Sequence, residues 1–283
     1  MPTVPEIITQ NVVRQLEAGV APWRKPWSTS IPQNLISKKS YRGLNLLALA
    51  TQGYGSPYWL TFKQAKHLDA RVRKGEKSTL VCFWKCGEFA KANALTGEVE
   101  NKKSVLLRYY HLFNAEQCDG LEDVCVDGWT PINSIEECES IANRMPNPPR
   151  IDRNSRAFYS PSADTVGIPS RNCFESAESY YTTLFHELIH STGHSSRLNR
   201  FDDSRSDQQF GSDSYSAEEL VAEIGAAMLA GIAGISPATL ANSASYLQSW
   251  ISRLKADSRL IITAASQAQK AVDYILGEGK EVL

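Results

Sequence analysis

The sequence predicts an α+β protein in two parts: a small N-terminal α+β domain, then a mainly helical domain with a short β-sheet. Three observations lead to this prediction. The length of 283 residues favours two domains, and an apolar content of 42% with 22% charged residues is typical of a globular chain. The charge changes sign between the two halves. From residue 175 on, helical periodicity covers almost the whole chain.

The charge asymmetry places the boundary between the two parts. Residues 1–115 hold 17 Lys or Arg against 7 Asp or Glu, whereas residues 116–283 hold 13 against 24. A basic half joined to an acidic half indicates that one part meets a polyanion. We therefore expect a domain at 1–120, an acidic and irregular linker at 121–133, and a second domain at 134–283.

The N-terminal domain is predicted to contain three helices and two strands. Ile8, Val12 and Leu16 recur at helical spacing in a first helix at 5–18. A short helix follows at 44–51, and a capping-box pattern at 61–64 opens a third. The two strands, at 78–85 and 105–113, are separated by a polar hairpin.

The C-terminal domain begins with a predicted helix at 135–144 and a stiff, proline-rich break. A β-hairpin is expected from strands at 157–159 and 165–168. Four helices complete the domain, at 176–192, 216–233, 238–256 and 258–276.

Cysteine usage and hydropathy indicate the compartment. None of the six cysteines forms a Cys-x-x-Cys pair, which favours six reduced thiols. The start of the sequence has no basic region followed by an apolar core, and the apolar run at 224–235 is shorter than the ~20 residues of a membrane span. We expect a cytoplasmic protein with no membrane partner.

The sharpest motif is His186-Glu187-Leu188-Ile189-His190. Residues four apart on a helix share one face, so both imidazoles can bind one metal ion. Glu187 lies beside that ion, where it can accept a proton from metal-bound water. The alternative is a chance match of three fixed positions. A helical setting, with apolar packing residues on both sides and Gly193 at the end, argues against chance.

A peptidase site of this kind needs a third protein ligand and an open position. The segment 216–223 supplies a following helix with carboxylates and small residues. We expect Glu219 to be the third ligand and Glu223 to accept a hydrogen bond from a ligand histidine, with Glu218 and Glu223 as alternative ligands. Glu219 could instead close a capping box with Ser216.

Two further residues near the motif have open roles. His194 follows His190 by four residues, but three ligands in a row on one straight helix cannot surround an ion tetrahedrally. Tyr215 could stabilise an oxyanion, or it could be a packing residue at the helix start. The metal is expected to be Zn²⁺, one per chain, because His and Glu ligands suit it, although Mn²⁺ or Co²⁺ could occupy the same site.

This geometry predicts a metal-dependent peptidase of the zincin type, acting on an unknown protein substrate. Metal-bound water would attack a carbonyl, and Glu187 would pass its proton to the leaving amine. The hairpin at 157–168 could lay an edge strand beside an extended peptide.

The basic half interleaves aromatic residues with cations, which favours single-stranded DNA. Rings stack on unpaired bases while Lys and Arg follow the phosphates. The alternative is a set of core aromatics beneath a solvated basic face. The candidate DNA-binding residues are Trp23, Arg24, Lys25, Trp27, Tyr41, Arg42, Asn45, Trp59, Lys63, Gln64, Lys74 and Lys77.

Several ordered motifs carry a family resemblance over nearly the whole chain. They are Pro22-Trp23-Arg24-Lys25-Pro26-Trp27, Tyr41-Arg42-Gly43-Leu44-Asn45, Trp59-Leu60-Thr61-Phe62-Lys63-Gln64-Ala65, Lys74-Gly75-Glu76-Lys77, the HExxH segment at 181–194, Phe210-Gly211-Ser212, and Glu218-Glu219-Leu220-Val221-Ala222-Glu223. With these motifs the chain resembles ArdC-type antirestriction proteins of conjugative plasmids, and the related N-terminal part of plasmid conjugative primases.

The resemblance implies an N-terminal domain that binds single-stranded DNA and a C-terminal zincin-like metallopeptidase domain. It also implies a role in protecting incoming plasmid DNA during conjugation, with His186 and His190 as metal ligands and Glu187 as the catalytic residue. Position 191 departs from the family, since Ser191 stands where an aromatic residue is usual. Two alternatives stay open: a non-catalytic protein that coats single strands and holds a structural metal, and a protease of DNA–protein crosslinks.

Overall fold

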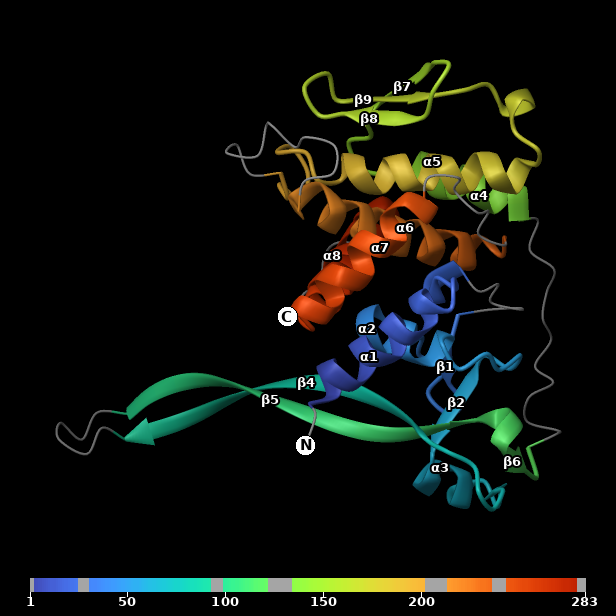
Figure 1. Cartoon of the computed structure of the whole chain (residues 1–283). Helices are drawn as coiled ribbons and strands as arrows, with labels where there is room; N and C mark the ends of the chain where they lie inside the picture. The colour runs from blue at the N-terminus through green and yellow to red at the C-terminus, as the bar shows by residue number, and fades with distance from the viewer. Residues whose placement is uncertain are drawn as a thin grey trace.

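The computed structural model describes residues 3–24, 31–92, 99–121, 134–201, 213–235 and 243–278. Its elements are stacked in layers (Figure 1). A small sheet lies over two helices at one end, further helices fill the middle, and a second sheet with a long ribbon lies at the other end. The predicted α+β class is confirmed.

The N-terminal elements form the second sheet and its covering helices. In chain order they are α1 (Val4–Glu17), the 3-10 turn η1 (Pro22–Arg24), β1 (Gln33–Asn34), α2 (Gly43–Ala50), β2 (Tyr58–Thr61), α3 (Phe62–His67), β3 (Arg71–Val72), β4 (Thr79–Ala92), β5 (Val99–Asn114), η2 (Ala115–Gln117) and β6 (Cys118–Asp119). The sheet order is β1-β2-β5-β4, while β3 and β6 form a separate pair. The capping box predicted at the start of α3 is present.

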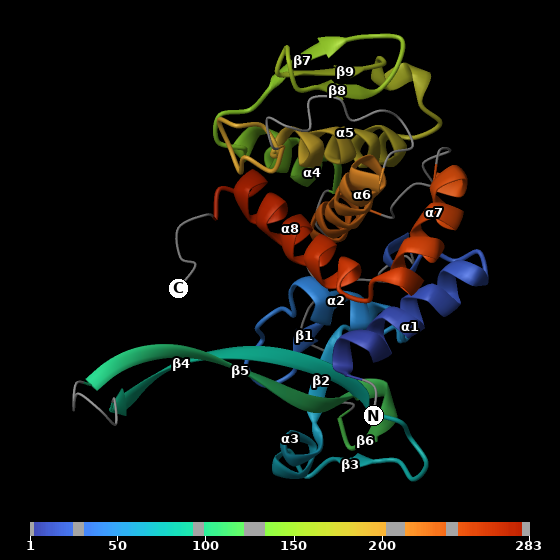
Figure 2. The same cartoon turned by 60° about the vertical axis from the view of Figure 1, so that its left-hand side comes forward.

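Strands β4 and β5 make a ribbon that stands away from the rest of the molecule (Figures 1 and 2). Their antiparallel pairing runs from Thr79 opposite Leu112 to Ala92 opposite Val99. The predicted strands were too short, since the first ended at residue 85 and the second began only at residue 105. Apolar alternation fades in the outer part of the ribbon, so only backbone pairing reveals that the strands continue there.

The C-terminal elements begin with α4 (Ser134–Arg144) and the small sheet. Strands β7 (Arg150–Arg153), β8 (Phe158–Ser160) and β9 (Thr165–Ile168) have the order β7-β9-β8, so β8 is an edge strand. Sequence reasoning missed β7, which pairs in parallel with β9. After η3 (Arg171–Cys173), the helices are α5 (Ala177–Ser191), α6 (Asp213–Ala233), α7 (Ser243–Ala256) and α8 (Leu260–Ile275).

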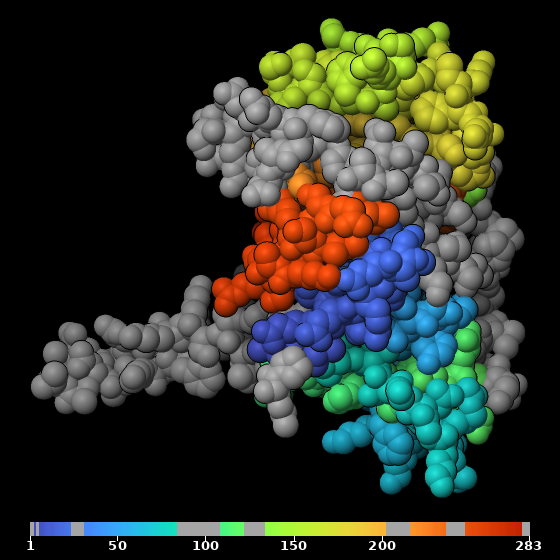
Figure 3. Space-filling model, in the orientation of Figure 1, coloured from blue at the N-terminus to red at the C-terminus, as the bar shows by residue number. Residues whose placement is uncertain are grey.

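The two halves share one hydrophobic core. Its largest cluster joins side chains of α5, α6 and α8 to side chains of α1, α2 and Trp23. The Trp23 and Trp250 rings meet edge to face, with centroids 5.7 Å apart. Figure 3 shows α1 and α7 side by side at the surface. The division at 121–133 stays a prediction, and residues 122–133 lie outside the described part of the chain.

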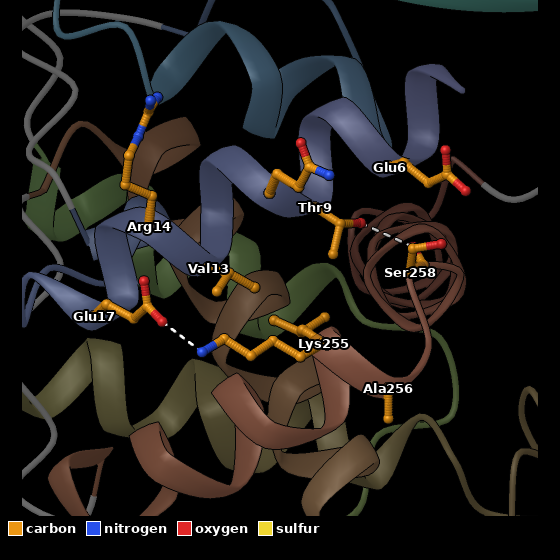
Figure 4. A pocket seen from close by; sticks show the side chains of 10 residues that line it. Glu6, Thr9, Val13, Arg14, Glu17, Lys255, Ala256 and Ser258 are labelled. Carbon is orange, nitrogen blue, oxygen red and sulfur yellow. Dashed lines mark hydrogen bonds and ion pairs between the residues drawn. The ribbon is translucent and has the colours of Figure 1, made fainter. Parts of the chain in front are cut away.

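A cleft of about 530 Å³ opens along this seam between α1 and the end of α7 (Figure 4). Glu17 pairs with Lys255 across it at 2.6 Å, and the Thr9 hydroxyl donates to the Ser258 carbonyl at 2.8 Å. None of the predicted site residues lines the cleft. It therefore marks the junction of the two halves rather than the predicted site.

The structure gives information on two of the predicted features, the membrane-spanning potential of the helices and the state of the cysteines. In the described residues, no helix is long and apolar enough to cross a membrane. Four cysteines within the described ranges form no disulfide bond: Cys82, Cys118, Cys138 and Cys173.

Candidate metal centre

Helix α5 presents the two motif histidines on one face. The helix begins where the Ser176 hydroxyl accepts a hydrogen bond from the Ser179 amide at 3.1 Å. It ends near Gly193, where a Cβ atom would lie 2.5 Å from the Phe201 ring. His186 and His190, one turn apart, bring their Nε2 atoms to 3.1 Å from each other.

Helix α6 brings Glu219 to the same point. Its carboxylate oxygens lie 3.5 Å from Nε2 of His186 and 3.5 Å from Nε2 of His190. The capping-box alternative for Glu219 is wrong, because α6 begins at Asp213 and Ser216 lies inside the helix. The Ser216 hydroxyl instead bonds to the Ser249 hydroxyl at 2.9 Å.

The predicted small-residue face of α6 allows this approach of the two helices. Ala222, Ala226 and Ala230 are all buried. A Cβ atom at Gly225 would lie 2.6 Å from Cδ1 of Ile189 in α5, so the absence of a side chain there lets the helices pack closely.

The three donor atoms fit one divalent cation. Bonds of ~2.0–2.2 Å to a tetrahedral ion separate neighbouring ligand atoms by about 3.3–3.6 Å. His186, His190 and Glu219 offer donor atoms that all lie within 4.8 Å of one another, and all three side chains are largely buried. Three protein ligands leave a fourth position open, as a catalytic site requires.

The carboxylate that meets the other ring nitrogen of His190 belongs to Glu218, not to Glu223 as we expected. Glu218 Oε1 lies 3.3 Å from His190 Nδ1. Glu223 is buried one turn further along α6. His194 lies beyond the end of α5 with Nδ1 bonded to the Ser196 hydroxyl at 2.8 Å, so it is not among the three clustered donors.

Charges in the site shift its pKa values in opposite directions. Burial by itself would lower the pKa of His190, but hydrogen bonds with Glu218 and Glu219 outweigh it and raise the pKa to about 10. Burial would raise the pKa of Glu218, but the Arg200 guanidinium and His190 hold it below its usual range. Glu219 likewise has a lowered pKa, because both histidines outweigh its burial.

Glu187 has the opposite shift. It lies beside the two histidines, and burial raises its pKa above the usual value despite the positive charge near it. A raised pKa makes this carboxyl group a better proton acceptor, which suits general acid–base chemistry. Tyr215 lies in the first turn of α6, and its side chain is outside the described part of the structure.

The predicted hairpin lies over helix α5, which carries the two motif histidines. The fully buried Arg197 side chain donates to the Ser191 and Asn147 carbonyls and pairs with Asp164, which precedes β9. Asp164 also accepts from the Tyr159 hydroxyl of β8 at 2.9 Å. These bonds fix the edge strand β8 beside the end of α5.

Burial removes the basis for base stacking by several predicted DNA-binding residues. Trp23 is 0% exposed and Trp59 2%, and Tyr41 is also buried, so none of these rings has a free face. They pack in the core, which is the alternative left open above. The side chain of buried Asn45 makes two bonds with the Cys82 backbone. Its Nδ2 donates to the Cys82 carbonyl at 2.6 Å, and its Oδ1 accepts from the Cys82 N–H at 2.9 Å.

The other N-terminal candidates are distributed differently. Lys63, Lys74 and Lys77 are exposed, while exposed Arg42 pairs with Asp273 of α8. Gln64 completes the cap of α3. Lys25 and Trp27, and the side chain of Arg24, lie outside the described residues.

Sequence reasoning missed a set of exposed aromatic residues in this half. Phe62 at the start of α3 is 61% exposed, and Phe83, Tyr109 and Tyr110 are exposed on the ribbon. These residues lie on an outward face of α3 or of a two-stranded ribbon. A search for aromatic residues on the outward faces of the predicted elements could have found them.

Two family models match the chain. The N-terminal domain of anti-restriction factor ArdC matches residues 2–113, and a zincin-like metallopeptidase model matches residues 136–267. A metal-free crystal structure of antirestriction protein ArdC from plasmid R388 is 39% identical, with a TM-score of 0.78 and 97% of both chains covered. An Mn(II)-bound structure of R388 ArdC is 34% identical, with a TM-score of 0.77 and 100% of both chains covered.

The chain belongs to the ArdC family of antirestriction proteins. The predicted resemblance is thereby confirmed, including the link to primases. Two Escherichia coli proteins named DNA primase TraC are 37% and 36% identical over 98% of this chain, which spans only 27% and 20% of their length. Protein y4eC of Sinorhizobium fredii (strain NBRC 101917 / NGR234) is 36% identical over 95% of this chain and 90% of its own.

Family membership and the geometry of the three donor residues both indicate a site for a divalent metal. The R388 relative is described with Mn(II), and the donor set of this ArdC-family chain suits a divalent metal. The C-terminal half carries the zincin-like part of the family.

Proposed function

We propose that this protein is a plasmid antirestriction protein that binds single-stranded DNA and hydrolyses a protein substrate with a zinc ion, in the cytoplasm, during conjugation. The observation that carries the peptidase part is the convergence of His186, His190 and Glu219 beside buried Glu187. Zinc is preferred because a set of two imidazoles and one carboxylate suits it, while Mn²⁺ and Co²⁺ fit the same donors.

A zinc ion held there would lower the pKa of its bound water and polarise the scissile carbonyl. Glu187 accepts the proton of the attacking water and returns it to the leaving amine. As an edge strand, β8 can pair with an extended peptide, which would fix the peptide direction over α5. Burial around the site strengthens each of these electrostatic interactions.

The test separates catalysis from metal binding. Glu187→Gln keeps the size of the side chain and all three ligands, so the variant should hold metal as the wild type does but lose hydrolysis. His186→Ala should lose both. Each variant is assayed for metal content and for protection of plasmid DNA during conjugation into a restricting host.

The outcomes distinguish a peptidase from a non-catalytic protein that coats single-stranded DNA. Loss of protection with Glu187→Gln supports the peptidase, since only the proton acceptor has changed. Full protection with Glu187→Gln would refute the peptidase role and leave a DNA-coating protein with a structural metal. A wild type that neither contains nor takes up metal would refute the metal site itself.

For DNA binding, we propose that the exposed aromatics replace the buried ones as stacking residues. Phe62 lies next to exposed Lys63 on α3, which combines a free ring with a cation. Phe62→Ala should weaken binding of an oligonucleotide by about 1–3 kcal/mol for each base that stacks on it. Phe158→Ala, an exposed aromatic of the other half, is the matched control.

Fluorescence anisotropy with a single-stranded oligonucleotide and its duplex, over a range of salt concentrations, measures this. The single strand should bind more tightly, and the affinity should fall with salt because cations meet phosphates. Equal loss with Phe158→Ala, or equal affinity for the duplex near physiological salt, would contradict stacking at α3.

A further inference from the structure

Arg200 joins the two helices that supply the metal ligands. Its Nη2 donates to the Ile189 carbonyl in the last turn of α5 at 2.9 Å, and its Nη1 donates to the Thr192 hydroxyl at 2.5 Å. The same guanidinium meets Glu218 of α6 through Nη2 at 2.6 Å and Nε at 3.3 Å. Only 7% of the Arg200 side chain is exposed, so one buried cation cross-links α5 and α6.

Glu218 in turn holds His190. With its Oε1 atom 3.3 Å from Nδ1, the carboxylate selects the tautomer that carries hydrogen on Nδ1. In the neutral ring that a metal ion would bind, the Nε2 lone pair then faces His186 and Glu219, where the donor atoms converge. An acceptor on the far ring nitrogen fixes the orientation of a metal-binding histidine and makes it a better ligand.

His186 lacks this support. Its Nδ1 atom is buried, and no atom in the described part of the chain accepts a hydrogen bond from it. Within the described part of the chain, the two histidines are therefore held unequally. His190 is the ligand whose ring and tautomer are set by neighbouring side chains.

We propose that Arg200 is a positioning residue for the metal centre, which acts by holding Glu218 against His190. This inference rests on the metal site proposed above and assigns a role to two residues outside its ligand set. Without the guanidinium, Glu218 would be a buried carboxylate that keeps His190 as its one partner among the described residues. Such a carboxylate gains free energy by turning toward water, and His190 would lose its anchor.

The expected effect is on metal affinity. Mutation of a residue that supports a ligand histidine, including replacement of a charged acceptor by a neutral one, weakens metal binding by about 10–100-fold. Glu218→Gln and Arg200→Met should each have an effect of this size. Arg200→Lys keeps the charge but not the planar fork that bonds Glu218 twice, so it should restore only part of the affinity.

The experiment uses the full chain and Zn²⁺ as the probe. Dissociation constants are measured by competition with a chelator for the wild type, Arg200→Met, Arg200→Lys, Glu218→Gln and the Arg200→Met/Glu218→Gln double variant. If Arg200 acts through Glu218, the double variant should bind Zn²⁺ about as well as Glu218→Gln alone. The visible spectrum of bound Co²⁺ reports any change in ligand geometry independently of affinity.

Arg197→Met is the matched control. Arg197 is also a buried arginine after α5, but it bonds to Asp164 and to the Ser191 and Asn147 carbonyls rather than to Glu218. The Arg197→Met variant should be less stable than the wild type but should have the same Zn²⁺ dissociation constant and Co²⁺ spectrum. Circular dichroism establishes whether each variant is folded. If Arg200→Met does not fold, Glu218→Gln and Arg200→Lys test the proposal instead.

The possible failures are distinguishable. A wild type that binds no Zn²⁺ would overturn the metal site. A wild type that binds Zn²⁺ together with folded Arg200 and Glu218 variants of equal affinity would overturn only the positioning role. Additive effects of Arg200→Met and Glu218→Gln, or an equal loss with Arg197→Met, would also overturn it.

Discussion

The close approach of α5 and α6 can be tested by adding one methyl group at Gly225. In an open helix, Gly→Ala stabilises by about 0.8–1.0 kcal/mol through helix propensity. Here the new Cβ atom would lie 2.6 Å from Cδ1, 2.9 Å from Cγ1 and 3.1 Å from Cγ2 of Ile189, which is fully buried. Overpacking of a core costs about 1–3 kcal/mol. We expect Gly225→Ala to lower the free energy of unfolding by about 0–2 kcal/mol.

A second substitution isolates the clash. Ile189→Val removes Cδ1, the atom nearest to the added methyl group, and by itself costs about 0.5–1.5 kcal/mol. In the double variant the two changes should compensate, with a coupling of about 1–2 kcal/mol. Urea unfolding of all four proteins gives the midpoints and slopes for this cycle. A stabilised Gly225→Ala variant, or zero coupling to Ile189→Val, would refute the proposed contact.

Two other substitutions test buried polar contacts by the same unfolding assay. Asp164→Asn leaves the fully buried Arg197 guanidinium without its anion, so we expect a loss near the low end of about 3–5 kcal/mol. Burial would raise the pKa of Asp164, but bonds from Arg197 and Tyr159 lower it, so this contribution is present above about pH 4 and lost as the pH falls through the folded-state pKa. Wild-type stability that falls no more than that of Asp164→Asn on acidification would contradict this. Asn45→Ala should cost about 2–4 kcal/mol by stranding the amide and carbonyl of Cys82, with Asn45→Asp intermediate because it keeps the acceptor.

The HExxH part of the site could be predicted because it depends only on helix geometry. Two histidines four residues apart share a face in any α-helix, so His186 and His190 needed no tertiary information. Glu219 was predicted from a carboxylate on a small-residue face. The choice between Glu218 and Glu223 as the partner of a histidine was beyond the sequence, because it depends on the rotation of α6 and on Arg200, which arrives from a loop.

In the N-terminal half, residue types alone do not show which aromatic side chains are exposed and which are buried. An aromatic residue next to cations stacks on a base if it is exposed and packs in a core if it is not, and composition is the same in both cases. Trp23 and Trp59 are buried, whereas Phe62 is exposed. Burial is decided by which helices cover the sheet. Leu49 of α2 lies in the buried cluster that contains Trp59. Trp23 instead packs against Trp250 of α7, which follows it by more than 200 residues and could not be placed from local patterns.

The shared core predicts that the C-terminal half is not stable alone. Six large apolar side chains of the N-terminal half lie in the same buried cluster as α5, α6 and α8: Val12, Val13, Leu16, Trp23, Leu46 and Leu47. At about 1.5–3 kcal/mol for each buried side chain, they contribute about 9–18 kcal/mol. This matches or exceeds the whole stability of a typical domain, about 5–15 kcal/mol. Residues 134–283 expressed alone should therefore aggregate or melt without cooperativity in circular dichroism, and co-expression of residues 1–121 should restore them. A soluble 134–283 fragment with the melting temperature of the full chain would show that these contacts add little, and that the two halves are independent domains as the charge pattern predicts.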